Sequence, residues 1–116
     1  MAKILIVDDS TELLDLFSIL LTSKGNHVRT APNIQKAEEQ LLWIKFDVVL
    51  IDVHLGNEDG RHLSYVVSMD HNIPVILISG DGELLKDHTK YGASAILEKP
   101  FDLEIINKTI QQVLKK

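Results

Sequence analysis

Acidic side chains stand at the ends of two strongly apolar segments of the chain. Asp8 and Asp9 follow directly after the apolar run 4–7, and Asp52 lies inside the apolar segment 48–53. A carboxylate in so apolar a segment costs free energy unless it is paired or functional. Asp52 therefore has no convincing structural explanation, and it is the first candidate for a reactive residue.

A hydroxyl group and an ammonium group follow two further apolar segments. Ser79 comes directly after residues 75–78, and Lys99 comes two positions after residues 95–97. In an open parallel α/β sheet, ligands bind outside the carboxyl ends of the strands. If these segments are parallel strands, residues far apart in sequence meet at one edge of the sheet.

The charges of this set indicate what it binds. Asp8, Asp9 and Asp52 carry three negative charges and Lys99 returns one positive charge, so the carboxylates repel unless a cation or a proton joins them. A site made only of oxygen ligands suits Mg²⁺. With the ion in place, Asp52 can act as a nucleophile toward a phosphoryl group. Lys99, the Ser79 hydroxyl and Mg²⁺ would then stabilise the phosphoryl oxygens.

The hydrophobic pattern predicts five strands that alternate with five helices. The expected strands are 4–7, 27–31, 48–53, 75–78 and 95–97, and the expected helices are 11–24, 33–43, 60–69, 82–91 and a last one capped by Asp102. Continuous apolar strands alternating with amphipathic helices indicate a parallel sheet covered on both faces. Residues 1–116 are thus predicted to form one doubly wound α/β domain, without linker or repeat.

Composition excludes several classes of function. The 116 residues include no cysteine, which rules out thiol chemistry and disulfides. The formal charge of -5 argues against direct nucleic-acid binding. The five histidines are scattered, which disfavours a transition-metal site. No apolar run is long enough to span a membrane, and the first strand leaves no room for a signal peptide, so a cytoplasmic location is expected.

Three segments of the chain, together with Ser79, resemble response-regulator receiver domains of two-component signalling. The segments are Ile4-Leu-Ile-Val-Asp-Asp-Ser10, Asp52-Val-His-Leu-Gly-Asn-Glu-Asp-Gly60 and Gly92-Ala-Ser-Ala-Ile-Leu-Glu-Lys-Pro-Phe101. The resemblance runs from Lys3 to the last helix. It implies a flavodoxin-like five-stranded sheet of order 2-1-3-4-5, and often a cis peptide bond before Pro100.

The resemblance also implies roles for the site residues. Asp52 would be the phosphoacceptor, assisted by Ser79 and Lys99. Asp9 and Asp52 would ligate Mg²⁺ directly with the backbone carbonyl of His54, and Asp8 would act largely through water. A histidine kinase or a histidine phosphotransfer protein would supply the phosphoryl group, and an output protein would read it. The domain would catalyse only its own phosphorylation and dephosphorylation.

Simpler interpretations exist for several of these residues. Asp8 and Asp9 could cap the first helix, because Asp9-x-x-Glu12 has the form of a capping box. Ser79 and Lys99 could be ordinary residues at strand ends. Trp43, near the end of the second predicted helix, is expected to pack against the core. The stripe of Leu84, His88 and Tyr91 could be either a core contact or a partner surface.

Two other functions compete with the switch. Most receivers have an aromatic residue at the position of Ile96, so the chain could bind partners without switching. A Mg²⁺-dependent phosphohydrolase with an aspartyl nucleophile is the second rival. Enzymes of the haloacid-dehalogenase type carry Asp-x-Asp after their first strand and a cap insertion, and this chain has neither. A homodimer through the face of the fourth helix, fifth strand and fifth helix is also left open.

Overall fold

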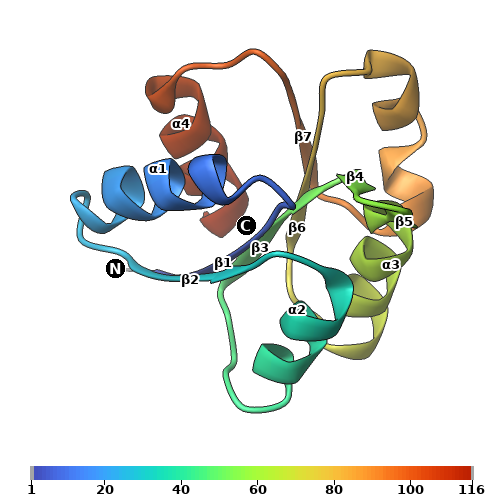
Figure 1. Cartoon of the computed structure of the whole chain (residues 1–116), viewed down its shortest axis with the longest axis horizontal. Helices are drawn as coiled ribbons and strands as arrows, with labels where there is room; N and C mark the ends of the chain where they lie inside the picture. Colours follow the sequence, from blue (N-terminus) through green and yellow to red (C-terminus); the bar gives the residue numbers. More distant parts are fainter. Residues whose placement is uncertain (1, 116) are drawn as a thin grey trace.

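A single sheet of five parallel strands organises the chain, and the computed structural model describes residues 2–115. The strands of this sheet are β1 (Lys3–Val7), β2 (His27–Ala31), β3 (Val48–Asp52), β6 (Val75–Ser79) and β7 (Ala95–Glu98). Their spatial order is β2-β1-β3-β6-β7 (Figure 1). This is the predicted order 2-1-3-4-5, because β4 and β5 belong to a separate hairpin.

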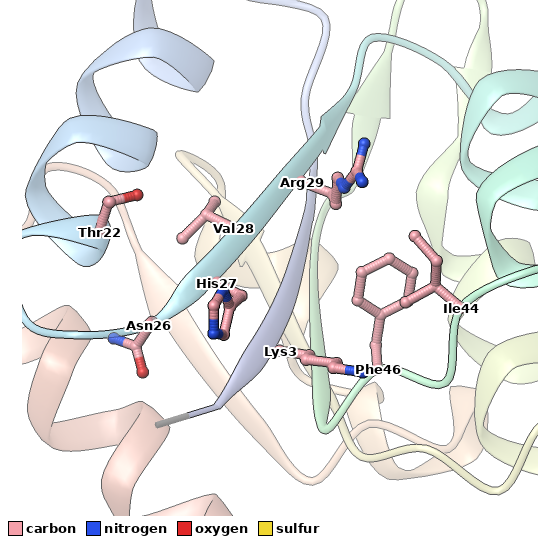
Figure 2. A pocket seen from close by; sticks show the side chains of 8 residues that line it. All are labelled: Lys3, Thr22, Asn26, His27, Val28, Arg29, Ile44 and Phe46. Carbon is pink, nitrogen blue, oxygen red and sulfur yellow. The ribbon is translucent and has the colours of Figure 1, made fainter.

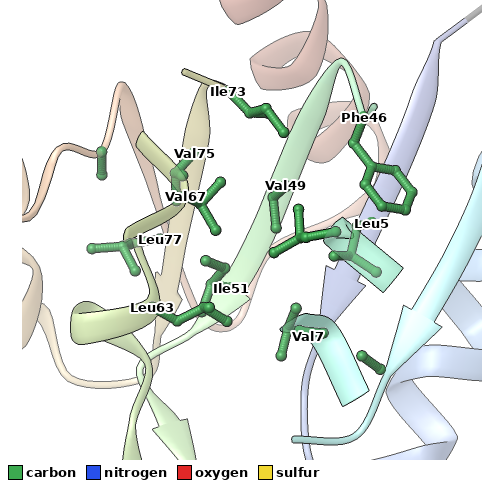
Figure 3. Close-up of a cluster of buried hydrophobic side chains, with 14 of the residues drawn as sticks. Leu5, Val7, Phe46, Val49, Ile51, Leu63, Val67, Ile73, Val75 and Leu77 are labelled. Atoms are coloured by element: carbon green, nitrogen blue, oxygen red, sulfur yellow. The ribbon is translucent and has the colours of Figure 1, made fainter. Parts of the chain in front are cut away.

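Helices cover both faces of the sheet. On one face, α1 (Thr11–Thr22) and α4 (Leu103–Leu114) pack against alternate strand residues. On the other face, α2 (Ile34–Leu41) and α3 (Gly60–Asp70) enclose the core that Figure 3 shows. The strands β1, β3 and β6 have nearly every residue buried, which explains their unbroken apolar sequences.

Each α-helix begins at a polar N-cap residue. Ser10 caps α1 by accepting a hydrogen bond from the backbone N–H of Leu13, and Asn33, Asp59 and Asp102 cap the other three in the same way. The alternative that Asp9 caps α1 is therefore wrong. Because Ser10 fills that role, the carboxylates of Asp8 and Asp9 are available for another one.

The segment 82–91 differs from the predicted continuous helix. It forms two short 3₁₀ turns, η1 (Gly82–Leu85) and η2 (His88–Tyr91). Gly92, with φ of 77°, ends the second turn. Leu84 and Tyr91 pack against the core beside α2 and α3, so this stripe is at least partly a core contact.

Trp43 is exposed, so the prediction that it packs against the core is wrong. The α2 helix ends at Leu41, and the next two residues lie beyond it in a turn. Leu42 and Trp43 are 75% and 86% exposed. The predicted helix, 33–43, ran two residues past the observed end of α2 at Leu41 and so included Trp43.

Candidate functional site

The carboxylate of Asp52 lies at the carboxyl end of the central strand β3, almost fully buried. Its Oδ1 accepts a hydrogen bond from the backbone N–H of His54 at 2.9 Å. Its Oδ2 accepts one from Nζ of Lys99 at 2.6 Å, although 47 positions separate the two residues. Lys99 follows β7, two strands away from β3, so the ion pair reaches across the end of β6.

Asp8 joins this ion pair from the end of β1. One of its oxygens accepts a hydrogen bond from the N–H of Ser10 at 2.9 Å. The other oxygen, Oδ2, is buried without a hydrogen-bond donor, and the ammonium of Lys99 lies 3.7 Å away. One ammonium thus faces two buried carboxylates. This local excess of negative charge is what a bound cation would neutralise.

The crowding alters the protonation of Asp8 and Lys99. Burial, reinforced by the charge of Asp52, raises the pKa of Asp8 to about 6, although the hydrogen bond from Ser10 opposes this. Burial alone would lower the pKa of Lys99, but its hydrogen bond to Asp52 and the two carboxylate charges outweigh burial and raise it. Lys99 therefore stays charged at neutral pH, while Asp8 titrates near physiological pH in the metal-free site.

Asp9 and Ser79 stand around this cluster. The carboxylate of Asp9 is exposed and accepts a hydrogen bond from the N–H of Gly56 at 3.0 Å. It thereby links the loop after β1 to the loop after β3. Ser79 is fully buried at the end of β6, and its Oγ accepts a hydrogen bond from the N–H of Asp81 at 3.0 Å. Because its oxygen acts as the acceptor there, the hydroxyl hydrogen can still be donated to a ligand.

The structure brings Asp8, Asp52 and Lys99 into direct contact, with Asp9 and Ser79 at the same edge of the sheet. His54 contributes its backbone, and its side chain is exposed. Within residues 2–115, no three acidic or histidine side chains converge closely enough to hold a metal ion by themselves. A site for Mg²⁺ would therefore need backbone and water ligands as well, which is usual for this ion. The peptide bond between Lys99 and Pro100 is cis.

Gly60 also supports the site, in a role that the sequence did not reveal. It is the first residue of α3, as in the predicted helix 60–69, and it packs closely against the end of β3. A Cβ atom at this position would lie 2.1 Å from the backbone oxygen of Asp52 and 2.8 Å from Cγ2 of Ile51. The hairpin of β4 (His54–Leu55) and β5 (Glu58–Asp59) brings the chain back to this contact. The only indication of this contact in the sequence is the glycine itself, because glycine allows two backbone segments to approach closely.

The raised pKa of Asp8 predicts how stability depends on pH without metal. Between pH 4 and pH 6 the folded chain retains a proton that the unfolded chain releases, because the unfolded pKa is near 3.8. The free energy of unfolding should therefore fall as pH rises through this range. Asp8→Asn should remove this part of the decline and be more stable than wild type at pH 7 in EDTA. Urea denaturation at several pH values measures both effects.

Asp15→Asn, on the exposed side of α1, is the matched control and should keep the wild-type profile. Adding Mg²⁺ should stabilise the wild type more than Asp8→Asn, because an ion that binds only the folded state shifts the folding equilibrium. An identical pH profile for wild type and Asp8→Asn would show that Asp8 does not carry the excess charge.

Comparison with known proteins gives one consistent result. Residues 4–111 match the sequence model of the response regulator receiver domain. The chain is 27% identical to the sensory transduction protein BceR of Halalkalibacterium halodurans and 33% identical to the two-component response regulator ARR10 of Arabidopsis thaliana, covering 100% and 98% of this chain. The chemotaxis response regulator CheY4 of Vibrio cholerae superposes with a TM-score of 0.90 at 31% identity, over 98% of this chain and 99% of CheY4.

The extent of these matches differs between the relatives. The chain spans 51% of BceR and 21% of ARR10. These two relatives are therefore much longer proteins, of which only one part corresponds to this chain. CheY4, by contrast, corresponds to it over nearly its whole length.

Proposed function

The chain belongs to the response regulator receiver domain family, and from this premise we propose that it is a phosphoacceptor switch with Asp52 as the acceptor. The main support for this proposal is the buried triad of Asp8, Asp52 and Lys99, in which one ammonium group lies near two carboxylates. A structural ion pair needs one carboxylate for each ammonium. The second carboxylate and its oxygen without a donor favour a site built for a cation and a phosphoryl group.

The proposed reaction is the transfer of a phosphoryl group from a phosphohistidine. A carboxylate oxygen of Asp52 forms a bond to phosphorus while the P–N bond to imidazole breaks, and the leaving nitrogen takes its electron pair. Lys99, now hydrogen-bonded to Oδ2 of Asp52, would donate to a phosphoryl oxygen. The Ser79 hydroxyl, whose oxygen is held by the N–H of Asp81, would donate to another.

The residues present fit the Mg²⁺ that this family generally uses. Asp8 has a buried oxygen without a donor, and Asp9 and Asp52 add two more carboxylates at the same edge. We propose that Asp9, Asp52 and the backbone carbonyl of His54 ligate the ion and that Asp8 acts largely through water. When bound, the ion would neutralise the excess carboxylate charge and draw electron density from the phosphoryl oxygens.

The partners follow from this function. We propose a histidine kinase or a histidine phosphotransfer protein as the donor and a separate protein as the reader of the phosphorylated form. A cytoplasmic location remains the prediction; in the described part of the chain no helix is both long and apolar enough to cross a bilayer. A homodimer through η2, β7 and α4, the counterpart of the face expected from the sequence, is open to test by sedimentation.

The side chain at position 96 distinguishes two forms of the proposal, a domain that switches on phosphorylation and a domain that only binds partners. Ile96 lies on the edge strand β7 and is 41% exposed, whereas most receivers carry an aromatic ring there. Isoleucine has no ring to swing inward when the hydroxyl of Ser79 moves. Signalling through β7 would therefore depend on the backbone contact between the N–H of Lys99 and the carbonyl oxygen of Ser79, at 2.9 Å.

Amide NMR spectra with beryllofluoride and Mg²⁺ test the proposal. Beryllofluoride binds a carboxylate as a phosphoryl group does. We expect large shifts at residues 52–56, 79–82 and 98–99, and smaller shifts that extend along β7 to Ile96. Shifts confined to the site would support the binding-only alternative, whereas an unchanged spectrum at saturating reagent would contradict the phosphoacceptor function itself.

A further inference from the structure

Two neighbouring hollows of the described surface lie along β2, away from the acidic site. One has a volume of about 500 Å³ and is lined mainly by Lys3, His27, Val28, Arg29, Ile44 and Phe46, as Figure 2 shows. The second, of about 590 Å³, shares Val28, Arg29 and Ile44 with the first and continues to Gln40 and Trp43. Together they form one trough along the edge strand of the sheet, which we name the β2 groove.

The backbone of β2 leaves hydrogen-bonding groups free in this groove. The N–H of His27 donates to Ala2, and the carbonyl of Ala31 accepts from Asp8, so these residues face β1. The backbone N–H and C=O groups of successive residues in a strand point to opposite edges. Those of Val28 and Thr30 therefore point away from β1. The Gln40 amide donates to the carbonyl oxygen of Thr30 at 2.8 Å and covers that end. Val28 keeps an open N–H and C=O, flanked by the hollow.

The groove carries positive charge in a chain whose net charge is -5. Lys3 pairs in register with His27, and Leu5 pairs with Arg29, so all these side chains lie on the face of the sheet that α2 covers. Figure 2 shows Arg29 on the same side of β2 as Ile44 and Phe46. Among the described residues, neither Lys3 nor Arg29 forms a salt bridge, and no acidic residue lines the first hollow.

The surroundings do not neutralise this charge. Glu39 lines the far end of the groove but lies 3.6 Å from the ammonium of Lys36, its neighbour on α2. The Oδ2 of Asp47 accepts a hydrogen bond from the backbone N–H of Lys3 at 2.7 Å, and within residues 2–115 the Lys3 ammonium forms no salt bridge. The groove thus combines an apolar floor, an open strand edge and two unpaired cations.

We propose that the β2 groove binds an extended acidic peptide segment of a partner protein, which adds as a strand beside Val28. Added strands bind through main-chain hydrogen bonds and gain specificity from alternate side chains. Because side chains alternate between the faces of a sheet, acidic residues two positions apart would both face Lys3 and Arg29. The residue between them would face Val28 and Thr22, on the α1 side, where a small apolar side chain fits.

Charge also argues against a second copy of this chain as the occupant. Pairing two β2 strands would bring Lys3 and Arg29 of both copies to one junction, and like charges across paired strands are destabilising. The groove lies along the edge strand, and none of its lining residues belongs to the site around Asp52. The proposal therefore does not depend on the phosphoacceptor function.

Trp43 supplies the readout, because it is the only tryptophan and borders the groove. The probe is the blocked peptide Thr-Glu-Val-Glu-Val-Thr, titrated into the full chain. We expect a change in Trp43 emission and slower exchange of the Val28 amide hydrogen. Arg29→Glu should weaken binding by about tenfold or more, since a like charge then faces the peptide. Lys108→Glu, on the exposed side of α4, is the matched control and should bind as wild type does.

Reversing the charges of both partners separates this proposal from nonspecific attraction. A peptide with lysine in place of both glutamates should bind Arg29→Glu more tightly than it binds wild type. N-methylation of the peptide groups that face β2 should abolish binding at unchanged charge. Equal binding of both peptides to wild type, or no binding at about 1 mM peptide, would overturn the proposal. So would a dimer in sedimentation that the acidic peptide dissociates, since the occupant would then be a second copy.

Asp52→Asn should bind the peptide with wild-type affinity, which keeps the two proposals independent. If Asp52→Asn is no longer labelled by acetyl phosphate but still binds the peptide, both proposals are supported. If the wild type binds the peptide but takes up no phosphoryl group, the groove proposal stands and the phosphoacceptor proposal fails. Peptide binding that depends on Asp52 would overturn the groove as a separate site.

Discussion

Asp52→Asn is expected to take up no phosphoryl group from acetyl phosphate in the presence of Mg²⁺, whereas the wild type becomes labelled. The amide keeps the shape of the carboxylate and can still accept from the N–H of His54, so the fold should survive. It lacks the negative oxygen that pairs with Lys99 and that we propose attacks phosphorus. Intact-protein mass spectrometry measures the added phosphoryl group directly.

Asp15→Asn is the matched control for this experiment, because Asp15 lies on the exposed side of α1. It should be labelled as fast as the wild type. Persistent labelling of Asp52→Asn at a serine, threonine or histidine would place the acceptor elsewhere and refute the assignment. Turnover of a generic phosphomonoester by the wild type would instead favour the phosphohydrolase alternative.

Gly60→Ala is expected to destabilise the fold by about 3 kcal/mol, at the upper end of the usual cost of inserting a methyl group into a packed site. The new Cβ would clash with the backbone oxygen of Asp52. A backbone atom cannot move aside as the end of a flexible side chain can. The N–H of Gly60 also donates to the carbonyl of Val53 at 2.7 Å, so α3 cannot retreat without losing that bond. Urea denaturation measures the loss.

Gly80→Ala provides the control with the same chemical change. The nearest atom to its added Cβ is Cβ of Lys99 at 4.0 Å, and its stability should change by less than about 0.5 kcal/mol. Gly60→Ala should also shift the amide signals of His54 and Gly56, because its methyl group displaces the loop after β3. Equal stability of the two variants would show that the contact between α3 and β3 yields easily.

The inner strands β1, β3 and β6 could be predicted from the sequence because burial on both faces leaves a continuous apolar run. All five sheet strands lie within one residue of their predicted bounds, and the order follows the expected one. The hairpin of β4 and β5 was missed, since two-residue strands carry no pattern. The segment 82–91 was assigned the wrong kind of helix, because the helical spacing of Leu84, His88 and Tyr91 also fits two 3₁₀ turns around a break at residues 86–87.

The residues that make up the candidate site could also be predicted, whereas the hydrogen bonds that they form could not. Strand ends marked Asp8, Asp52 and Lys99, and these three residues are in contact. Nothing in the sequence indicated that Asp9 would turn to the N–H of Gly56, or that one oxygen of Asp8 would be buried without a donor. These details depend on loop geometry, which neighbouring residues determine together. The metal ligands remain predictions.

The position of β1 between β2 and β3 has a consequence for the synthesis of the chain. Residues 4–7 are synthesised before either neighbouring strand, and the second neighbour, β3, comes 44 residues later. At about 5–20 residues per second, this strand waits roughly 2–9 s before both of its edges are paired. During that time four successive apolar residues, 4–7, have an edge that is open to pairing with other chains. An unpaired apolar strand is an aggregation hazard, so β1 is the strand of this sheet that depends most on β3 for protection.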